Sequence, residues 1–390
     1  MMMTKSFPSG SSSMSSSSDD VGVGVLGATG YIGVPYRAEM RDCDGVRMVA
    51  LCARRRSLLE SAAREDGAQL ATDEWRKVVE HPEVDYLVVG TPDALHHEAV
   101  MAAAAAGKHL FCEKPVAMNS IEAKQMLDAY LEAGTLAHFV PFWTRWSPGF
   151  VAAKSMVDEG VVGEVKAVVY RWHNPRPIDM ALTWRDDPKL SSAGTIADVG
   201  SHAYDTVRWI LGCDARRVLT HADVVTPSKL DRGDVNLTEA LECGLQGSLE
   251  KSSRKGETVD YANISWEFHG GVVGSLILSH ATYLRRGLAP ELEFHGTEAS
   301  LAVDRFHGKV TLARPDGALE LVEEVPAGGY DLGNRFRKWV VPALREVMSG
   351  KSQLDVDVPN LVDGWKAQLF TDAALESSRV GTWVEVDQPD

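Results

Sequence analysis

Short apolar runs alternate with amphipathic segments along about the first 140 residues. Each run is long enough for a buried strand, and the segments between them carry the periodicity of helices. Strands that alternate with helices through short connections form a parallel sheet with helices on both faces. We therefore predict an α/β domain with a doubly wound parallel sheet over residues 21–141, whose ligands lie beyond the carboxyl ends of the strands. The predicted strands are residues 21–26, 46–52, 86–90, 109–112 and 136–140, with a short one near residue 70.

Beyond about residue 141 the pattern changes to strands in which apolar and polar residues alternate. This period of two is typical of an antiparallel sheet with one buried face. We predict an α+β second domain over residues 142–358 with an open-faced, mostly antiparallel sheet, and a C-terminal helix within residues 359–390 that packs across both domains. Residues 227–257 are polar and contain several glycines, and their pattern assigns no element. The predicted strands are residues 165–172, 261–268, 272–280, 292–296, 300–304, 309–313 and 319–325.

Composition narrows the class of protein. The chain has 390 residues, 44% hydrophobic and 24% charged, which is ordinary for a globular protein of about two domains. No apolar run reaches the roughly 18 residues of a membrane span, and a net charge of −15 disfavours nucleic acid or an anionic membrane as a partner. Five cysteines without a CxxC pair favour a reducing, cytoplasmic location over a disulfide framework or a zinc cluster. Residues 1–20 are Ser-rich, lack the apolar core of a signal peptide and are predicted to be disordered.

A glycine-rich turn follows the first predicted strand and precedes a predicted helix. Glycines let the backbone approach a pyrophosphate, and the helix N-terminus faces its negative charge. The spacing is GxxGxxG, and its position between strand and helix predicts a dinucleotide-binding loop. The candidate cofactor contacts in this loop are Gly27, Thr29, Gly30, Tyr31 and Ile32.

The second predicted strand ends in the basic run Ala53-Arg54-Arg55-Arg56. In the common NAD-binding pattern an acidic residue near this strand end holds the ribose 2′-hydroxyl. No acid stands here to repel a 2′-phosphate, and guanidinium groups bind phosphate well. We therefore predict NADP in preference to NAD, with Arg54 and Arg55 as phosphate ligands. The alternative is a solvated basic start to the next helix.

The run Asp198-Val-Gly-Ser-His202 opens a predicted helix in the second domain. Positions 199, 203, 207 and 210 form its apolar face, and Asp198, His202 and Asp205 lie opposite. A carboxylate and an imidazole one turn apart can point into one cleft. Histidine, with an unperturbed pKa of about 6.5, is suited to proton transfer near neutral pH. The alternative is an exposed helix start with Asp198 as a cap and His202 in solvent.

Two longer motifs frame these residues. The first runs from Gly90-Thr91-Pro92 through His96 to Glu113-Lys114-Pro115, and the second is Asp198-x-Gly200-x-His202-x-x-Asp205. Together they resemble the Gfo/Idh/MocA family of NAD(P)-dependent oxidoreductases over about residues 21–385. The resemblance implies a Rossmann domain, bound NADP or NAD, and a homodimer or homotetramer built through the second sheet. It also implies cofactor contacts by Thr91, Pro92, His96, Glu113 and Lys114.

The resemblance assigns a role to each catalytic candidate. In the family, the lysine after the glutamate contacts the nicotinamide ribose and the substrate, which points to Lys114. The signature histidine acts as acid and base on the substrate oxygen, hence His202, and the signature aspartate orients substrate and imidazole, hence Asp198. The residue chemistry agrees, because a proton must leave oxygen as hydride leaves carbon, and a nearby cation stabilises the developing negative charge.

Three features depart from the family pattern. The glycine loop has one residue more between its first glycines than the usual GxGxxG, and Asp93 stands where Asn commonly follows Thr-Pro. The run Phe142-Trp143-Thr144-Arg145-Trp146 stands where many members have Phe-Asn-Tyr-Arg, so Trp143 is expected to reshape the substrate pocket. Extended short-chain dehydrogenases share a similar glycine loop but need Tyr-x-x-x-Lys, and no tyrosine here has lysine four positions on.

A loop over residues 173–185 supplies candidate substrate ligands. Its tryptophan and arginines suit a sugar, because an indole packs on an apolar ring face and guanidinium groups donate to hydroxyls. The alternative is that Trp172 and Trp184 belong to the core between domains. The full set of candidate substrate ligands is Arg145, Arg176, Trp184, Arg185, Asp198 and His202.

These observations predict an enzyme that transfers a hydride between NADP(H) and a hydroxyl or carbonyl carbon of a sugar or cyclic polyol. The twelve histidines show no metal-like cluster, so no metal is expected. Two alternatives remain on the same fold: a glycosidase that uses tightly bound NAD, and a non-catalytic binder of NADP or sugar. The combination of Lys114, Asp198 and His202 argues against the binder, which has no need of a proton-transfer group.

Overall fold

The computed structural model describes residues 20–177, 180–226, 228–233, 235–243, 253–281, 283–328 and 331–386, so residues 1–19 of the predicted leader over residues 1–20 lie outside them. Within these residues, the first sheet has six parallel strands in the order β3-β2-β1-β4-β5-β6. Strands β1 and β4 are buried at every residue, as expected of central strands covered on both faces. The predicted doubly wound sheet is therefore confirmed. Its strands are β1 (Val21–Leu26), β2 (Val46–Cys52), β3 (Leu70–Thr72), β4 (Tyr86–Val89), β5 (His109–Cys112) and β6 (His138–Phe139), and its helices are α1 (Gly33–Arg41), α2 (Arg56–Asp66), α3 (Trp75–Val79), α4 (His96–Ala105) and α5 (Ser120–Ala133).

Strands β1 and β4 are neighbours at the point where the strand order reverses. The Gly90 N–H, just after β4, donates to the Leu26 carbonyl at the end of β1 over 2.9 Å. Ligands of open α/β sheets bind in the crevice outside such a switch point. The glycine loop, the Thr91-Pro92 turn and the loop after β5 all begin at this edge.

In the part of the chain that the structure describes, the second sheet has nine strands in the order β16-β15-β14-β13-β7-β12-β11-β8-β17. All neighbouring strands are antiparallel except β7 and β12, which are parallel. Alternating burial along β7 and β11 reflects one covered face, which confirms the predicted mostly antiparallel sheet. Sequence reasoning missed its edge at β8 and β17. The strands are β7 (Val165–His173), β8 (Ala215–Asp223), β11 (Tyr261–Phe268), β12 (Val273–Ser279), β13 (Leu292–Gly296), β14 (Ser300–Asp304), β15 (Lys309–Ala313), β16 (Leu319–Glu324) and β17 (Val384–Glu385).

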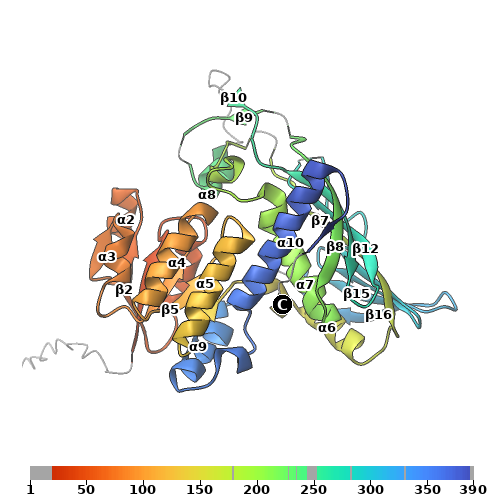
Figure 1. Cartoon of the computed structure of the whole chain (residues 1–390), viewed down its shortest axis with the longest axis horizontal. Helices are drawn as coiled ribbons and strands as arrows, with labels where there is room; N and C mark the ends of the chain where they lie inside the picture. Colours follow the sequence, from red (N-terminus) through yellow and green to blue (C-terminus); the bar gives the residue numbers. More distant parts are fainter. Residues whose placement is uncertain are drawn as a thin grey trace, which may run out of the picture.

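Three helices cover one face of this sheet: α6 (Pro148–Asp158), α7 (Ser201–Leu211) and α10 (Leu361–Val380). Helix α10 also lies along α5 of the first domain, so it contacts elements of both domains (Figure 1). Helix α9 (Val341–Met348) packs with α1 and β1 in one apolar cluster. The packing therefore groups α9 with the first domain, although our boundary at residue 358 groups it with the second. In the described residues, no helix has the length and apolar character needed to cross a bilayer.

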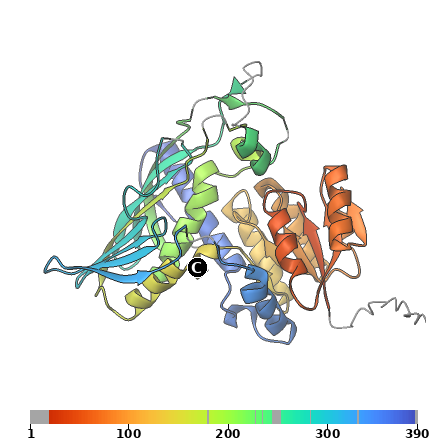
Figure 2. The same cartoon turned by 180° about the vertical axis from the view of Figure 1, so that it is seen from behind.

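The sequence pattern assigned no element to residues 227–257. Their described part forms β9 (Lys229–Leu230), α8 (Leu237–Cys243) and β10 (Ser253–Arg254), which lie at the top of the molecule in Figure 2. Leu237 and Ala240 pack on Met180 and Ala181 in a small separate core. Residues 172–190, which begin at the end of β7, are called the 172–190 loop. A buried ion pair, Lys229 Nζ to Asp186 Oδ1 at 2.6 Å, holds the start of the 227–257 segment to this loop.

Candidate active site

A cavity of about 810 Å³ runs from the glycine loop to the second domain. Its walls come from the carboxyl edge of the first sheet, the 172–190 loop, the start of α7 and the residues that lead into α8. Most of the residues singled out from sequence line this one space. They are Gly27, Thr29, Gly30, Tyr31, Ile32, Arg54, Arg55, Thr91, Pro92, Glu113, Lys114, Arg176, Trp184, Arg185, Asp198 and His202.

The glycine loop lies directly against the end of β4. Gly27 has φ +79°, and a Cβ there would lie 2.5 Å from the Gly90 carbonyl oxygen. A Cβ on Gly33, the first residue of α1, would lie 2.2 Å from the Gly27 carbonyl oxygen. The close approach leaves backbone and a helix N-terminus at the cavity wall, an arrangement that fits the phosphates of a dinucleotide.

Gly27→Ala is expected to destabilise the protein by roughly 1–3 kcal/mol, from backbone strain and contact with Gly90, and to weaken dinucleotide binding. Urea unfolding and calorimetry with NADP⁺ would measure the two effects. Gly67→Ala is the matched control, because Gly67 has φ +67° but a Cβ there would meet nothing within 4 Å. Equal loss of stability and unchanged cofactor affinity in both variants would contradict the importance of the close approach.

The end of the cavity at Arg54 and Arg55 carries more negative charge than the sequence suggested. Arg54 is exposed and Arg55 is half-buried, and both line the cavity. Arg55 forms an ion pair with Glu239 of α8, and Asp73, which follows β3, also lines this end. No acid follows β2, as read from the sequence, but Glu239 reaches Arg55 from elsewhere in the chain, and Asp73 brings a second carboxylate to the cavity wall.

Lys114 and Asp198 form the centre of the site. The Lys114 ammonium, on the loop after β5, donates to Asp198 Oδ1 at 2.9 Å and to its carbonyl oxygen at 2.8 Å. The other carboxylate oxygen lies 3.3 Å from Arg176 Nη2 and 3.3 Å from His280 Nε2. Burial favours a raised pKa for Asp198, but Lys114, His280 and Arg185 hold this pKa well below its usual value. Asp198 is therefore an anion that organises the cations around it.

His202 lies one turn after Asp198, in the first turn of α7. A π-helical turn, Ile196–Gly200, carries Asp198 into the helix. The imidazole stacks on Trp172 with ring centroids 5.8 Å apart and meets the edge of Phe142 at 5.7 Å. Burial, and then the charge of Lys114, lower the pKa of His202 well below its usual value, while Asp198 opposes them. The imidazole is therefore neutral at neutral pH, and its buried Nδ1 has no hydrogen-bond partner among the described residues.

His96 lies behind the cavity wall. Its Nε2 is 2.8 Å from the Thr91 carbonyl oxygen, and its Nδ1 is 3.1 Å from the Pro115 carbonyl oxygen. These contacts join the turn after β4 to the loop after β5. His96 therefore does not line the cavity, and its contacts position the two loops that do.

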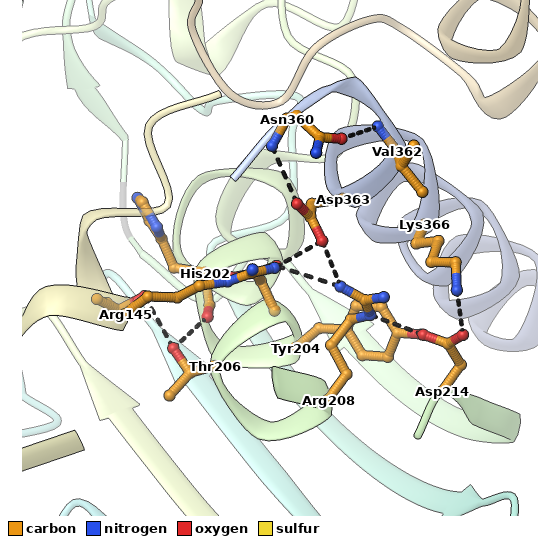
Figure 3. A network of polar contacts seen from close by, with 12 residues as sticks. Arg145, His202, Tyr204, Thr206, Arg208, Asp214, Asn360, Val362, Asp363 and Lys366 are labelled. Carbon is orange, nitrogen blue, oxygen red and sulfur yellow. Dashed lines mark hydrogen bonds and ion pairs between the residues drawn. The ribbon is translucent and has the colours of Figure 1, made fainter. Parts of the chain in front are cut away.

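Arg145 and Asp205 also lie away from the cavity. The Arg145 guanidinium donates to Asp205 at 2.6 Å and to Asp363 at 2.7 Å, and Arg208 donates to the same Asp363 (Figure 3). Asp363 is in the first turn of α10, and this helix packs on α7, so that Asp205 lies in the ion-pair network while Asp198 and His202 on the same side of α7 line the cavity. The structure thus places Arg145, predicted as a substrate ligand, in a buried ion-pair network behind His202.

Three tryptophans line the cavity. Trp143 departs from the family pattern, and the sequence left two interpretations open for Trp172 and Trp184. Trp143 Nε1 donates to the Tyr36 hydroxyl at 3.1 Å, and that hydroxyl donates to Glu113. Trp172 is both cavity wall and buried core. Trp172 thus belongs to the core and also faces the cavity, and its packing on a sugar ring stays a prediction.

Two further residues, Asp93 and His280, lie near the Lys114–Asp198 pair. Asp93 is buried and accepts from the Ser192 N–H at 3.0 Å, so the family departure at this position joins the first domain to the segment that leads into the π-helical turn Ile196–Gly200. Sequence reasoning missed His280, which follows β12 and carries no local motif. Its only signal in the sequence was its place at the end of a predicted strand.

Comparisons with known proteins agree with this geometry. The family model described as an oxidoreductase family with NAD-binding Rossmann fold matches residues 21–140, and the GFO/IDH/MocA C-terminal domain matches residues 150–302. The chain is 27% identical to a levoglucosan dehydrogenase of Pseudarthrobacter phenanthrenivorans, over 85% of this chain and 87% of that one. It is 25% identical to an NADP(+) scyllo-inositol 2-dehydrogenase of Bacillus subtilis, over 93% and 94%.

Solved structures share the fold. An oxidoreductase domain protein from Kribbella flavida superposes with a TM-score of 0.79 at 24% identity, over 95% of this chain and all of that one. A levoglucosan dehydrogenase in complex with NADH and levoglucosan superposes with a TM-score of 0.77 at 24% identity, with the same coverage. With both domain models matched in order and the two sequence motifs meeting in one cavity, the chain belongs to the Gfo/Idh/MocA family of oxidoreductases.

Proposed function

We propose that this protein is an NADP(H)-preferring oxidoreductase that transfers a hydride between nicotinamide and a hydroxyl or carbonyl carbon of a sugar or cyclic polyol. The observation that carries the proposal is the contact of Lys114 Nζ with Asp198 at 2.9 Å, in the same cavity as His202 and the glycine loop. The names of the relatives, levoglucosan dehydrogenase and inositol 2-dehydrogenases, support the substrate class.

The cavity wall divides into a cofactor part and a substrate part. The glycine loop would hold the pyrophosphate, Arg54 and Arg55 the 2′-phosphate, and the Thr91-Pro92 turn the nicotinamide end. When bound there, nicotinamide supplies the hydride acceptor or donor. The remaining chemistry belongs to side chains of this chain.

Proton transfer falls to His202. As a neutral base, its imidazole takes the proton from the substrate hydroxyl oxygen while the hydride leaves the carbon that bears this hydroxyl, and it returns a proton to that oxygen in reduction. The Lys114 ammonium stabilises the negative charge that develops on the substrate oxygen. Asp198 orients that ammonium through the 2.9 Å hydrogen bond.

Cofactor preference gives a direct test, since the relatives from Bacillus subtilis include both NADP(+) and NAD(+) scyllo-inositol 2-dehydrogenases. In calorimetry, Arg54→Ala/Arg55→Ala is expected to weaken NADP⁺ binding by tenfold or more, because each charged hydrogen bond contributes about 1.5–3 kcal/mol, with little effect on NAD⁺. Arg56→Ala is the matched control, because Arg56 is exposed, pairs with Glu60 and does not line the cavity. NAD⁺ binding tighter than NADP⁺ in the unaltered protein would overturn the preference.

Turnover decides between the proposal and its alternatives. Incubation with NADP⁺ and a panel of cyclic polyols and pyranoses is expected to produce reduced cofactor, read by its absorbance. Hydrolysis of a glycoside without net cofactor reduction would favour the glycosidase instead. Tight binding of cofactor and sugar with no reaction would favour the binder.

A further inference from the structure

The second-domain side of the cavity carries more positive than negative charge. Among the described residues of that domain that line the cavity, the charged ones are Arg176, Arg185, Arg286 and Asp198. The Asp198 charge is already matched by Lys114 from the first domain at 2.9 Å. The first-domain carboxylate Asp93, on which Arg185 and Lys114 act, lines the cavity as well. With Lys114 and Asp93 counted, four basic side chains still outnumber two carboxylates at the end of the cavity where the substrate would lie.

Arg185 and Arg286 both act on the guanidinium of Arg176. Burial lowers the pKa of Arg176, Asp198 opposes this effect, and Arg185 and Arg286 lower the same pKa further. Arg176 therefore lies within electrostatic reach of the other two arginines, and all three line the cavity. Like charges held together in this way are stabilised when an anion enters between them.

Two of the arginines have neutral partners: Arg286 is held by hydrogen bonds and Arg185 by packing on an indole ring. The Arg286 Nε donates to the His173 carbonyl oxygen at 2.8 Å, and its Nη2 donates to the Asn174 side chain. The Arg185 guanidinium lies 4.4 Å from the centroid of the Trp184 ring. Within the described parts of the chain, neither guanidinium has an ion-pair partner. Their hydrogen-bond and packing partners are therefore neutral, and both side chains line the cavity. Arg185 also lowers the pKa of Asp198 and opposes the effect of burial on the pKa of Asp93, without forming an ion pair with either carboxylate.

We infer that the substrate of this enzyme carries an anionic group, as a sugar acid or sugar phosphate does, and that Arg185 and Arg286 bind that group. This inference rests on the proposed function, because it takes the carbon that reacts to lie beside Lys114 and His202. Planar guanidinium groups pair with carboxylate and phosphate through two parallel hydrogen bonds, which gives both affinity and orientation. A neutral sugar would leave these charges unmatched.

The test compares matched ligands on the NADP⁺-loaded protein by calorimetry: glucose, glucuronate and glucose 6-phosphate. The anionic sugars are expected to bind at least about tenfold more tightly than glucose, as charge-assisted hydrogen bonds predict. Arg185→Gln and Arg286→Gln should each remove most of this preference and leave NADP⁺ affinity unchanged. Arg285→Gln is the matched control: the neighbouring arginine is exposed and does not line this cavity, so its loss should leave the preference intact. Whichever of glucuronate and glucose 6-phosphate binds more tightly identifies the anion as carboxylate or phosphate.

Each contrary outcome has a distinct meaning. Glucose bound as tightly as both anions, or no binding of either anion, would overturn the inference. Loss of NADP⁺ affinity in the Arg185 and Arg286 variants would also overturn it, because the arginines would then serve the cofactor phosphates. Reduction of NADP⁺ by neutral sugars, without preference for anions, would support the proposed function and overturn the inference of an anionic substrate. Tight, arginine-dependent binding of an anionic sugar without any hydride transfer would support the inference and reject the proposed function.

Discussion

His202→Ala is expected to lower turnover by roughly two to four powers of ten, the usual loss when an acid–base group is removed. The cofactor should still bind, because the glycine loop and the basic end of the cavity are formed by the other domain. Stopped-flow or steady-state measurement of NADP⁺ reduction, with calorimetry for cofactor affinity, would check both statements. His202→Gln keeps more of the packing against Trp172 and should lose activity to a similar extent.

The half-buried His97 provides a control for this result. It lies on the same turn of α4 as His96, contacts Gln125 and does not line the cavity, so His97→Ala should keep full activity. Unchanged turnover in His202→Ala would remove the imidazole from the reaction. A loss confined to KM would make His202 a substrate contact and not the base.

The pH profile of sugar oxidation tests the same role. A base must be neutral to accept a proton, so activity falls as pH drops through its pKa. Burial and Lys114 hold the pKa of His202 well below 6.5, so the acid limb of kcat/KM is expected below that pH and not at it. This limb should vanish in His202→Ala. An acid limb at or above 6.5 would contradict a buried neutral imidazole.

Arg145→Met is expected to destabilise the protein by about 3–5 kcal/mol, the usual cost of removing one partner from a buried ion pair. The variant would leave Asp205, which is fully buried, and Asp363 facing one guanidinium, that of Arg208, instead of two. Burial raises the pKa of Asp205 and Arg145 lowers it, so loss of Arg145 leaves a carboxylate whose charge is poorly compensated. Urea unfolding would measure the change in stability.

Arg379→Met is the control for that experiment. Arg379 is 71% exposed and pairs only with Glu376 among the described residues, and surface pairs of this kind contribute about 1 kcal/mol or less. The comparison also separates two roles for Arg145. A variant that unfolds easily but keeps its KM supports the structural network, whereas a stable variant with a raised KM would restore the substrate role expected from sequence.

The departures from prediction have a common cause, which α7 illustrates. The periodicity correctly separated its apolar face from the face with Asp198, His202 and Asp205. It did not reveal that α10, from the end of the chain, covers part of the polar face and brings Asp363 to Arg145. The same reason explains His280 and Glu239, each of which reaches a predicted residue from a part of the chain without any motif.

The sequence by itself determined the two kinds of sheet, the family and the chemical character of the candidate residues. These depend on local pattern: the period of hydrophobic positions, glycine between strand and helix, and residue types at short spacing. Only the tertiary structure decided which of those residues share a cavity and what charge surrounds them. Contacts such as Lys114 with Asp198, 84 positions apart, arise from packing of whole elements, and burial and neighbouring charges then shift each pKa. Neither can be read from a short stretch of chain.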